Sequence, residues 1–161
     1  MFETRPVGLD FLETAPLRLS FAGTMTAPPA AVFDAIARDV TALPRWYGAV
    51  AAAEYGGAVP HGVGAKRRVK LVGGLAFHEE VLAWDEPDRY AYRMDRTSVP
   101  GIRAMAEKWS VLETMAGTRV TWTVAIDAAL PTAAAVRGAV PGITVATRRA
   151  LGRLDRRLAS A

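Results

Sequence analysis

The sequence predicts an α+β protein of one domain, and three observations support this prediction. A strand pattern over Leu17–Met25 is followed by two short helical segments. A run of alternating apolar and polar residues, interrupted by turn residues, then predicts an antiparallel meander. The chain closes with a long amphipathic helix. With 161 residues, it is long enough to bury a core without disulfides or structural metals.

The first strand is predicted because Leu17, Leu19 and Phe21 alternate with polar or small residues and so share one face. Residues 1–16 show no sustained period. We expect them to form an arm, or a short strand-like extension, ahead of a single domain over residues 17–161.

Two short helices are expected after this strand. Consecutive prolines stop the strand and suit the first turn of a helix from Pro29 to about Arg38. Pro44 breaks the helical pattern, and a second short helix or turn is expected to end near Gly48. We expect no strand between these helices and the meander.

The meander and the closing helix account for the rest of the chain. The predicted strands are Ala65–Val72, Leu75–Trp84, Arg89–Asp95, Met105–Met115 and Thr118–Ala129. Apolar residues then recur at intervals of three and four from Val136 to Leu158. The dipeptide Pro141-Gly142 is expected either to kink this helix or to start a new one.

The composition excludes several kinds of chemistry. The chain has no cysteine, which excludes disulfides, cysteine–zinc sites and thiol nucleophiles. It has only two histidines, His61 and His78, which argues against a multi-histidine metal centre. The Gly62-Val-Gly64 turn opens a strand instead of a helix, so it does not form a phosphate-binding loop. We therefore expect no metal and no cofactor.

The basic charge is concentrated near the C-terminus. The net charge is +4, but six arginines and one acidic residue fall between Arg137 and Ala161, leaving 14 basic and 15 acidic side chains before them. We expect these arginines to be the solvated face of an amphipathic helix. Nucleic acid is not an expected partner, and contact with an anionic membrane surface is a weaker alternative.

The sequence also indicates where the protein works. No apolar stretch reaches the roughly 20 residues that a membrane helix needs. The first residues lack the pattern of a signal peptide, because Glu3, Arg5 and Asp10 interrupt it. A cytoplasmic location is expected. The oligomeric state is left open.

Four stretches, taken together, resemble a known superfamily. They are Ala27-Pro-Pro-Ala-Ala-Val-Phe-Asp34, then Asp39-Val with Leu43-Pro-Arg-Trp-Tyr47, then Gly62-Val-Gly64 through Glu79-Glu-Val81 to Asp85-Glu-Pro-Asp-Arg89 and Tyr92, and finally Trp109 with Gly117-Thr-Arg-Val-Thr-Trp122. Their order and spacing are similar to the START-like, or SRPBCC, superfamily, in particular its polyketide cyclase/dehydrase-like members. The resemblance covers roughly residues 17–158.

The resemblance implies a helix-grip fold. In this fold a curved antiparallel sheet wraps around a long C-terminal helix, two short helices follow the first strand, and a largely apolar cavity lies between sheet and helix. Members of the superfamily bind lipids, sterols and plant metabolites, or cyclise and dehydrate polyketides. The fold therefore does not select one function.

Glu79, Arg67 and Tyr92 are the candidate catalytic residues. If the strand over residues 75–84 turns Glu79 inward, burial would raise its pKa and suit it to proton transfer. Alternatively, Glu79 points outward and pairs with Arg67 or Arg93 on a neighbouring strand. Arg67 could hold a ligand carboxylate or an enolate, or belong to a solvated strand face.

Aromatic residues complete the candidate ligand site. The candidate ligand-binding residues are Trp46, Tyr47, Arg67, Phe77, Glu79, Tyr92, Trp109 and Trp122. Trp46 and Tyr47 either gate the cavity or plug the core, and Trp109 and Trp122 either line a pocket or fill the core. His78 is expected on the opposite face of its strand from Glu79, at the surface.

Three functions follow, in order of preference. The first is binding, and with it transport or sequestration, of a small hydrophobic, aromatic or lipid-like ligand. The alternative is a cyclase or aromatase/dehydratase acting on a carbonyl-rich substrate, with Glu79 or Tyr92 moving protons and Arg67 stabilising an enolate. The third is docking to membrane or nucleic acid through the arginine-rich helix.

Overall fold

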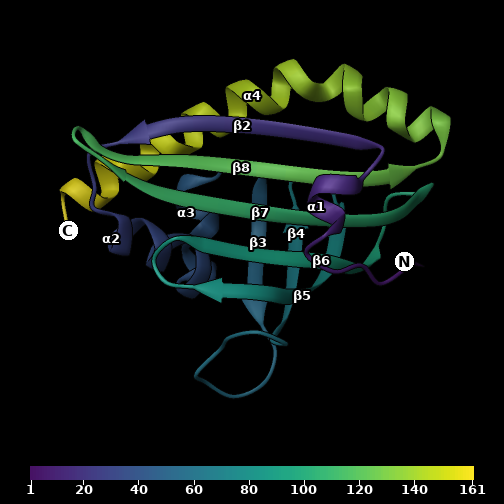
Figure 1. Cartoon of the computed structure of the whole chain (residues 1–161), viewed down its shortest axis with the longest axis horizontal. Coiled ribbons are helices and arrows are strands. Elements are labelled where there is room, and N and C mark those ends of the chain that lie inside the picture. The colour runs from purple at the N-terminus through teal and green to yellow at the C-terminus, as the bar shows by residue number, and fades with distance from the viewer.

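A single curled antiparallel sheet and one long helix form the body of the molecule (Figure 1). The computed structural model describes all 161 residues. In spatial order the main strands are β2 (Leu17–Met25), β8 (Gly117–Ala128), β7 (Ile102–Thr114), β6 (Arg89–Thr97), β5 (Ala76–Asp85), β4 (Lys66–Leu71) and β3 (Val50–Tyr55). This arrangement confirms the predicted α+β fold with a helix-grip architecture.

Strand β3 was not expected from the sequence. Its residues, Val-Ala-Ala-Ala-Glu-Tyr, contain three alanines, which have low strand propensity and give no clear alternation. The strand forms because its backbone pairs with β4, with Ala53 opposite Val69. The prediction that no strand separates the short helices from the meander is therefore wrong.

The short helices between β2 and β3 form a continuous turn-rich connection. It consists of α2 (Pro29–Phe33), a π-helical turn η1 (Asp34–Arg38), a 3-10 turn η2 (Val40–Ala42) and α3 (Leu43–Trp46). Both α2 and α3 begin with a proline near their first position, where the missing N–H costs nothing. Phe33 and Ile36 of this connection are buried in the core, and Ile36 also lines the cavity.

Helix α4 (Leu130–Ala159) runs through Pro141 as one element of 30 residues and arches over the sheet (Figure 1). The sequence-based alternative of a new helix at Pro141 is therefore wrong. Four of its five buried residues lie after Pro141, namely Thr147, Ala150, Leu151 and Leu154. The C-terminal half of α4 is therefore the anchored half.

Two contacts fix this anchored half against β2. A Cβ atom at Gly23 would lie 2.7 Å from Leu151 Cδ1, so the glycine allows α4 to approach the strand closely. The carboxylate of Asp155 accepts hydrogen bonds from the backbone N–H groups of Thr26 and Ala27 at 2.9–3.0 Å. These bonds join the last turns of α4 to the chain that leaves β2.

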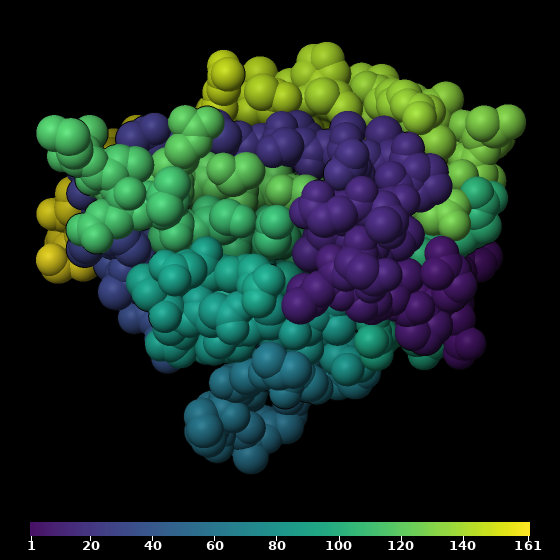
Figure 2. Space-filling model, in the orientation of Figure 1, coloured from purple at the N-terminus to yellow at the C-terminus, as the bar shows by residue number.

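The first 16 residues pack on the face of the sheet opposite the cavity and cover part of it (Figure 2). Strand β1 (Phe2–Glu3) pairs with β6, and the short helix α1 (Phe11–Thr14) buries Phe11 and Leu12. They pack against a layer of alanines on β5 to β8, composed of Ala83, Ala91, Ala104, Ala106 and Ala125. The concave face is thus left free to face α4.

Candidate ligand-binding cavity

A cavity of about 450 Å³ lies between the concave face of the sheet and α4. It is lined by 29 residues, of which 25 are hydrophobic. Side chains from β2 and from β4 to β8 form its walls, and the face of α4 that carries Val136, Ile143 and Ala146 closes it. Ligand pockets in proteins typically measure about 300–1,000 Å³ and are mainly apolar, so this cavity has the usual dimensions.

Three charged side chains line this apolar space: Arg67 on β4, Glu79 on β5 and Glu107 on β7. Arg67 and Glu79 lie directly opposite each other in the pairing of β4 with β5. The Arg67 Nε atom donates to Glu79 Oε2 at 2.5 Å, and both residues are only 4% exposed. Glu79 is therefore both inward and paired, which combines the two alternatives that the sequence left open.

Burial governs the protonation of Glu79. It raises the pKa of Glu79 from 4.5 to about 7, although the adjacent Arg67 guanidinium opposes this shift. The guanidinium also lies over the Tyr92 ring, with Arg67 Cζ 4.2 Å from the ring centroid. A carboxyl group that titrates near neutral pH, beside a fixed cation, can exchange a proton with a bound molecule.

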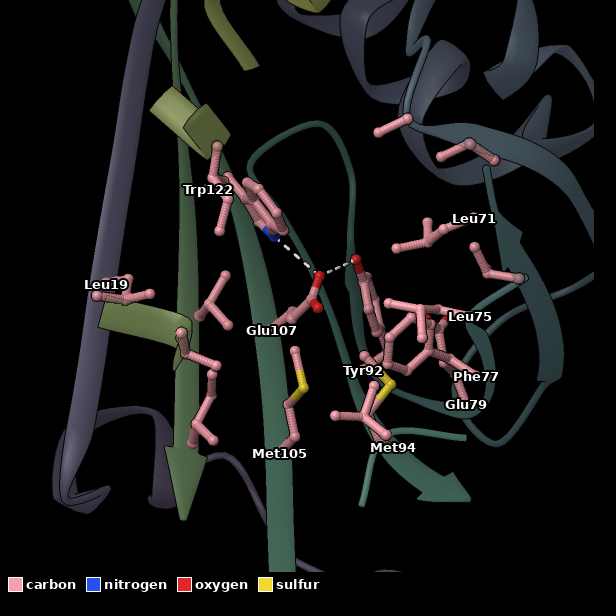
Figure 3. Close-up of a pocket in the computed structure, with 18 of the residues that line it drawn as sticks. Leu19, Leu71, Leu75, Phe77, Glu79, Tyr92, Met94, Met105, Glu107 and Trp122 are labelled. Carbon is pink, nitrogen blue, oxygen red and sulfur yellow. Dashed lines mark hydrogen bonds between the residues drawn. The ribbon is translucent and has the colours of Figure 1, made fainter. Parts of the chain in front are cut away.

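Glu107 is the charged group that the sequence analysis missed. Its Oε2 atom accepts a hydrogen bond from the Tyr92 hydroxyl at 2.5 Å and one from Trp122 Nε1 at 2.8 Å (Figure 3). Trp109 Nε1 donates in turn to the Tyr92 oxygen at 3.2 Å. Burial raises the pKa of Glu107. The available signal was its phase, since Met105, Glu107 and Trp109 occupy alternate positions on one strand.

Most of the predicted ligand-binding residues meet at this cavity. Those on its wall are Tyr47, Arg67, Phe77, Glu79, Tyr92, Trp109 and Trp122. Trp109 and Trp122 stack with ring centroids 5.4 Å apart. The Tyr47 hydroxyl lies 3.1 Å from Thr147 Oγ1 on α4. Burial raises the pKa of Tyr47 to about 12.

Trp46 does not line the cavity. It is 1% exposed, stacks on Tyr47 with ring centroids 5.8 Å apart, and packs into the main core. Its Nε1 atom is the one enclosed side-chain nitrogen or oxygen that makes no hydrogen bond. The structure therefore places Trp46 behind the wall, where it supports Tyr47.

The remaining polar candidates lie outside the cavity. His78 precedes Glu79 in the sequence and is partly buried, but it does not line the cavity. Arg93 forms ion pairs with Glu80 and Asp95. No cluster of three or more histidine or acidic side chains is placed to hold a metal ion. No helix has the length and apolarity that crossing a membrane would require.

A curled sheet that grips a long helix around an apolar cavity defines a START-like protein. The chain matches the family described as "Polyketide cyclase / dehydrase and lipid transport" over residues 18–159, and it belongs to that family.

Similar proteins include mycobacterial relatives. The chain is 33% identical over 156 residues to the "Uncharacterized protein Rv2574" of Mycobacterium tuberculosis (strain ATCC 25618 / H37Rv), covering 97% of this chain and 93% of the relative. The same values hold for the "Uncharacterized protein Mb2604" of Mycobacterium bovis.

Solved structures share the fold. The Zhui aromatase/cyclase from Streptomyces sp. R1128 superimposes with a TM-score of 0.70 at 18% identity, covering 88% of this chain and 95% of that one. A START superfamily protein from Mycobacterium smegmatis gives a TM-score of 0.68 at 13% identity, covering 89% of this chain and 97% of that one. A Thermobifida fusca protein gives a TM-score of 0.68 at 27% identity, covering 86% of this chain and 93% of that one.

Proposed function

We propose that this protein binds a small hydrophobic or aromatic molecule in the cavity and so carries or sequesters it. The observation that supports this function is an apolar space of about 450 Å³ with only three charged side chains in its wall. Burying a ligand there removes apolar surface from water on both sides, at roughly 25 cal/mol per Å². The family description, which includes lipid transport, is consistent with this role.

Within this proposal the ligand contacts are divided by chemistry. Phe77, Trp109 and Trp122 supply flat apolar surface, and Tyr47 adds a ring at the side of α4. The few polar contacts come from the side chains of Arg67, Glu79, Tyr92 and Glu107. Trp46 contributes only by supporting Tyr47.

A cavity-filling variant tests this proposal. Ala146 lines the cavity from α4, so Ala146→Trp is expected to place an indole in the empty space and weaken binding of a neutral naphthalene probe at least tenfold. Val145 is its neighbour on α4 but is 47% exposed and absent from the wall, so Val145→Trp is the matched control. Isothermal titration calorimetry measures both affinities. Equal probe binding by the two variants, or no binding by the unmodified protein, would contradict the proposed function.

A second candidate function is an aromatase/cyclase-type reaction, and the observation that favours it is the Glu79–Arg67 pair on the cavity wall. Glu79 near its pKa of about 7 would take a proton from carbon between two carbonyl groups. The Arg67 guanidinium would stabilise the enolate, which attacks a second carbonyl carbon to form a carbon–carbon bond. Glu79 would return this proton to the new alkoxide oxygen. It would then take the remaining proton from the same carbon, and protonation of the hydroxyl group by Glu79, or by Tyr92 with Glu79 restoring the Tyr92 proton, would release water and leave a carbon–carbon double bond.

The enzyme hypothesis is tested with a hydrophobic triketone, in which the carbon between two carbonyl groups can attack the third carbonyl group and close a ring by internal aldol condensation. Mass spectrometry would detect a product lighter by one water molecule. Glu79→Gln should abolish this product, whereas Glu113→Gln, an exposed change on β7, should not. Turnover that survives Glu79→Gln would exclude Glu79 as the base.

A further inference from the structure

The two buried carboxylates of the cavity differ in what neutralises them. Glu79 faces Arg67, which is the only cationic side chain on the wall. Glu107, 6% exposed, has no ion-pair partner within 4.0 Å and receives hydrogen bonds only from Tyr92 and Trp122. The wall therefore carries one more acidic group than basic groups, and the excess acidic group is Glu107.

The free oxygen of Glu107 faces the cavity. Both donors, the Tyr92 hydroxyl and the Trp122 indole N–H, bind Oε2, and Oε1 receives no hydrogen bond. Oε1 is not among the enclosed unpaired atoms, because Trp46 Nε1 is the only such atom in the molecule. Since Glu107 lines the cavity, Oε1 is reached from the cavity itself (Figure 3).

The orientation of this carboxylate is fixed from behind. Tyr92 is itself held as a donor, because its oxygen accepts the Trp109 N–H and its hydrogen points to Glu107. Donors that bind one carboxylate oxygen hold the group in place and present the other oxygen as an acceptor. A buried acceptor without a partner costs about 1–3 kcal/mol, so a ligand that donates to it is favoured.

We infer that Glu107 is the recognition point for a ligand hydrogen-bond donor, so that the ligand is a hydrophobic molecule bearing a hydroxyl or amino group and not a carboxylate. This inference rests on the proposed binding function and specifies its ligand class. A ligand carboxylate is disfavoured because the positive charge of Arg67 is already balanced by Glu79, so a ligand anion would add to the unbalanced negative charge of Glu107.

The test compares three naphthalene probes substituted at the same ring position, at mildly alkaline pH. Naphthol can donate to Glu107, methoxynaphthalene cannot donate, and naphthoate carries a carboxylate. We expect calorimetry to show naphthol binding about tenfold more tightly than methoxynaphthalene, and naphthoate binding more weakly than both. Equal affinities for naphthol and methoxynaphthalene would overturn the inference.

Glu107→Gln provides a second, opposite readout. The Tyr92 and Trp122 donors should hold the amide oxygen in the position of Oε2, which leaves the amide N–H₂ group facing the cavity as a donor. The variant should therefore lose the preference for naphthol and bind acetylnaphthalene, a carbonyl acceptor, about tenfold more tightly than naphthol. Glu113→Gln on the same strand should behave as the unmodified protein. A preference for naphthol that persists in Glu107→Gln would overturn the inference.

These outcomes separate the inference from the proposed function. If no probe binds the unmodified protein, the binding function fails and the inference falls with it. If all probes bind equally well, the cavity is a binding site but Glu107 does not select the ligand. The comparison of naphthol with methoxynaphthalene needs no variant, so it holds even if Glu107→Gln does not fold.

Discussion

Burying Arg67 and Glu79 together removes both side chains from water, and their mutual attraction offsets part of this loss. In place of water, the Arg67 guanidinium donates a hydrogen bond to Glu79 and lies over the Tyr92 ring. The raised pKa of Glu79 shows that burial outweighs the attraction of Arg67 for the carboxylate. A buried group of this kind makes the free energy of unfolding depend on pH.

Glu79 is expected to make the protein less stable as pH rises. Its pKa is about 7 in the folded protein and lies near 4.5 in the unfolded chain, so within this window the folded protein holds a proton that the unfolded chain has released. The free energy of unfolding should therefore fall between pH 4.5 and pH 7. This contribution amounts to about 3 kcal/mol.

Urea unfolding of the unmodified protein and of Glu79→Gln across this window measures the effect. Glutamine does not titrate, so the stability difference between the two proteins should shift in favour of the variant as pH rises. Glu113→Gln, an exposed change, should keep the pH dependence of the unmodified protein. Parallel curves for the unmodified protein and Glu79→Gln would show that the Glu79 pKa is not raised.

At single residues, the sequence could indicate Glu79 and Arg67 but could not settle how they are arranged. Period-two alternation predicts which residues share a face, but not which face is inward. The pairing of β4 with β5 decides that Arg67 lies opposite Glu79, and this register depends on the whole sheet. Glu107 was overlooked although it shares the phase of Trp109. Its role depends on a hydrogen bond from Tyr92, a residue on another strand.

The two halves of α4 differ in how firmly they are held. The half after Pro141 is anchored by Leu151, Leu154 and Asp155. The half before it covers the cavity but buries only Ala133, and Gly138 and Pro141 lower its helix propensity. We therefore expect this first half to open for ligand entry.

Replacing by alanine both Gly138, in the first half, and Gly142, directly after Pro141 where the two halves join, tests this expectation. A Cβ atom at either position meets nothing within 4 Å, so alanine fits without strain. Each change should add roughly 0.5–1 kcal/mol of helix stability. The double variant should slow hydrogen exchange in the first half of α4 and slow release of a naphthalene probe in stopped-flow measurements.

The matched control for this experiment is Gly152→Ala in the anchored half of α4, where the added Cβ meets its nearest neighbour at 3.8 Å. This variant should also stabilise the helix but leave the rate of probe release unchanged. If the double variant released the probe as fast as the unmodified protein, the cavity would open elsewhere.

At the level of elements, the sequence predicted six of the eight strands within a few residues, because inward and outward residues alternate clearly along strands such as β2 and β4. Of the other two, β1, which has two residues, was expected only as a short strand-like extension within residues 1–16, and β3, which is rich in alanine, was not predicted. Each forms through pairing with another strand, β1 with β6 and β3 with β4, and local patterns do not encode this pairing. The continuity of α4 through Pro141 likewise depends on packing against the body.

Over the whole molecule, positive charge and ligand cavity occupy different places. Arg148, Arg149, Arg153 and Arg156 in the second half of α4 are exposed, and none of them makes an ion pair within 4.0 Å. The cavity wall is apolar and includes none of them. The basic pI of about 9.8 therefore describes one surface of α4 and not the binding site.

This separation predicts that ligand binding is insensitive to salt. Arg148, Arg149 and Arg153 are exposed and absent from the cavity wall, so replacing all three with glutamine should leave naphthol affinity unchanged. Stability should change by no more than about 0.5 kcal/mol for each change. Raising ionic strength should also leave the affinity unchanged, because the recognising contacts are shielded from solvent.

Binding to vesicles of anionic lipid, compared with neutral vesicles, tests whether the arginine surface of α4 acts independently of the cavity. Any association should fall steeply with salt and disappear in the triple variant, because it would depend on exposed charge. Calorimetry with naphthol and vesicle co-sedimentation on the same two proteins provide both readouts. A loss of naphthol affinity in the triple variant would contradict the separation and make the arginine surface of α4 part of the ligand site.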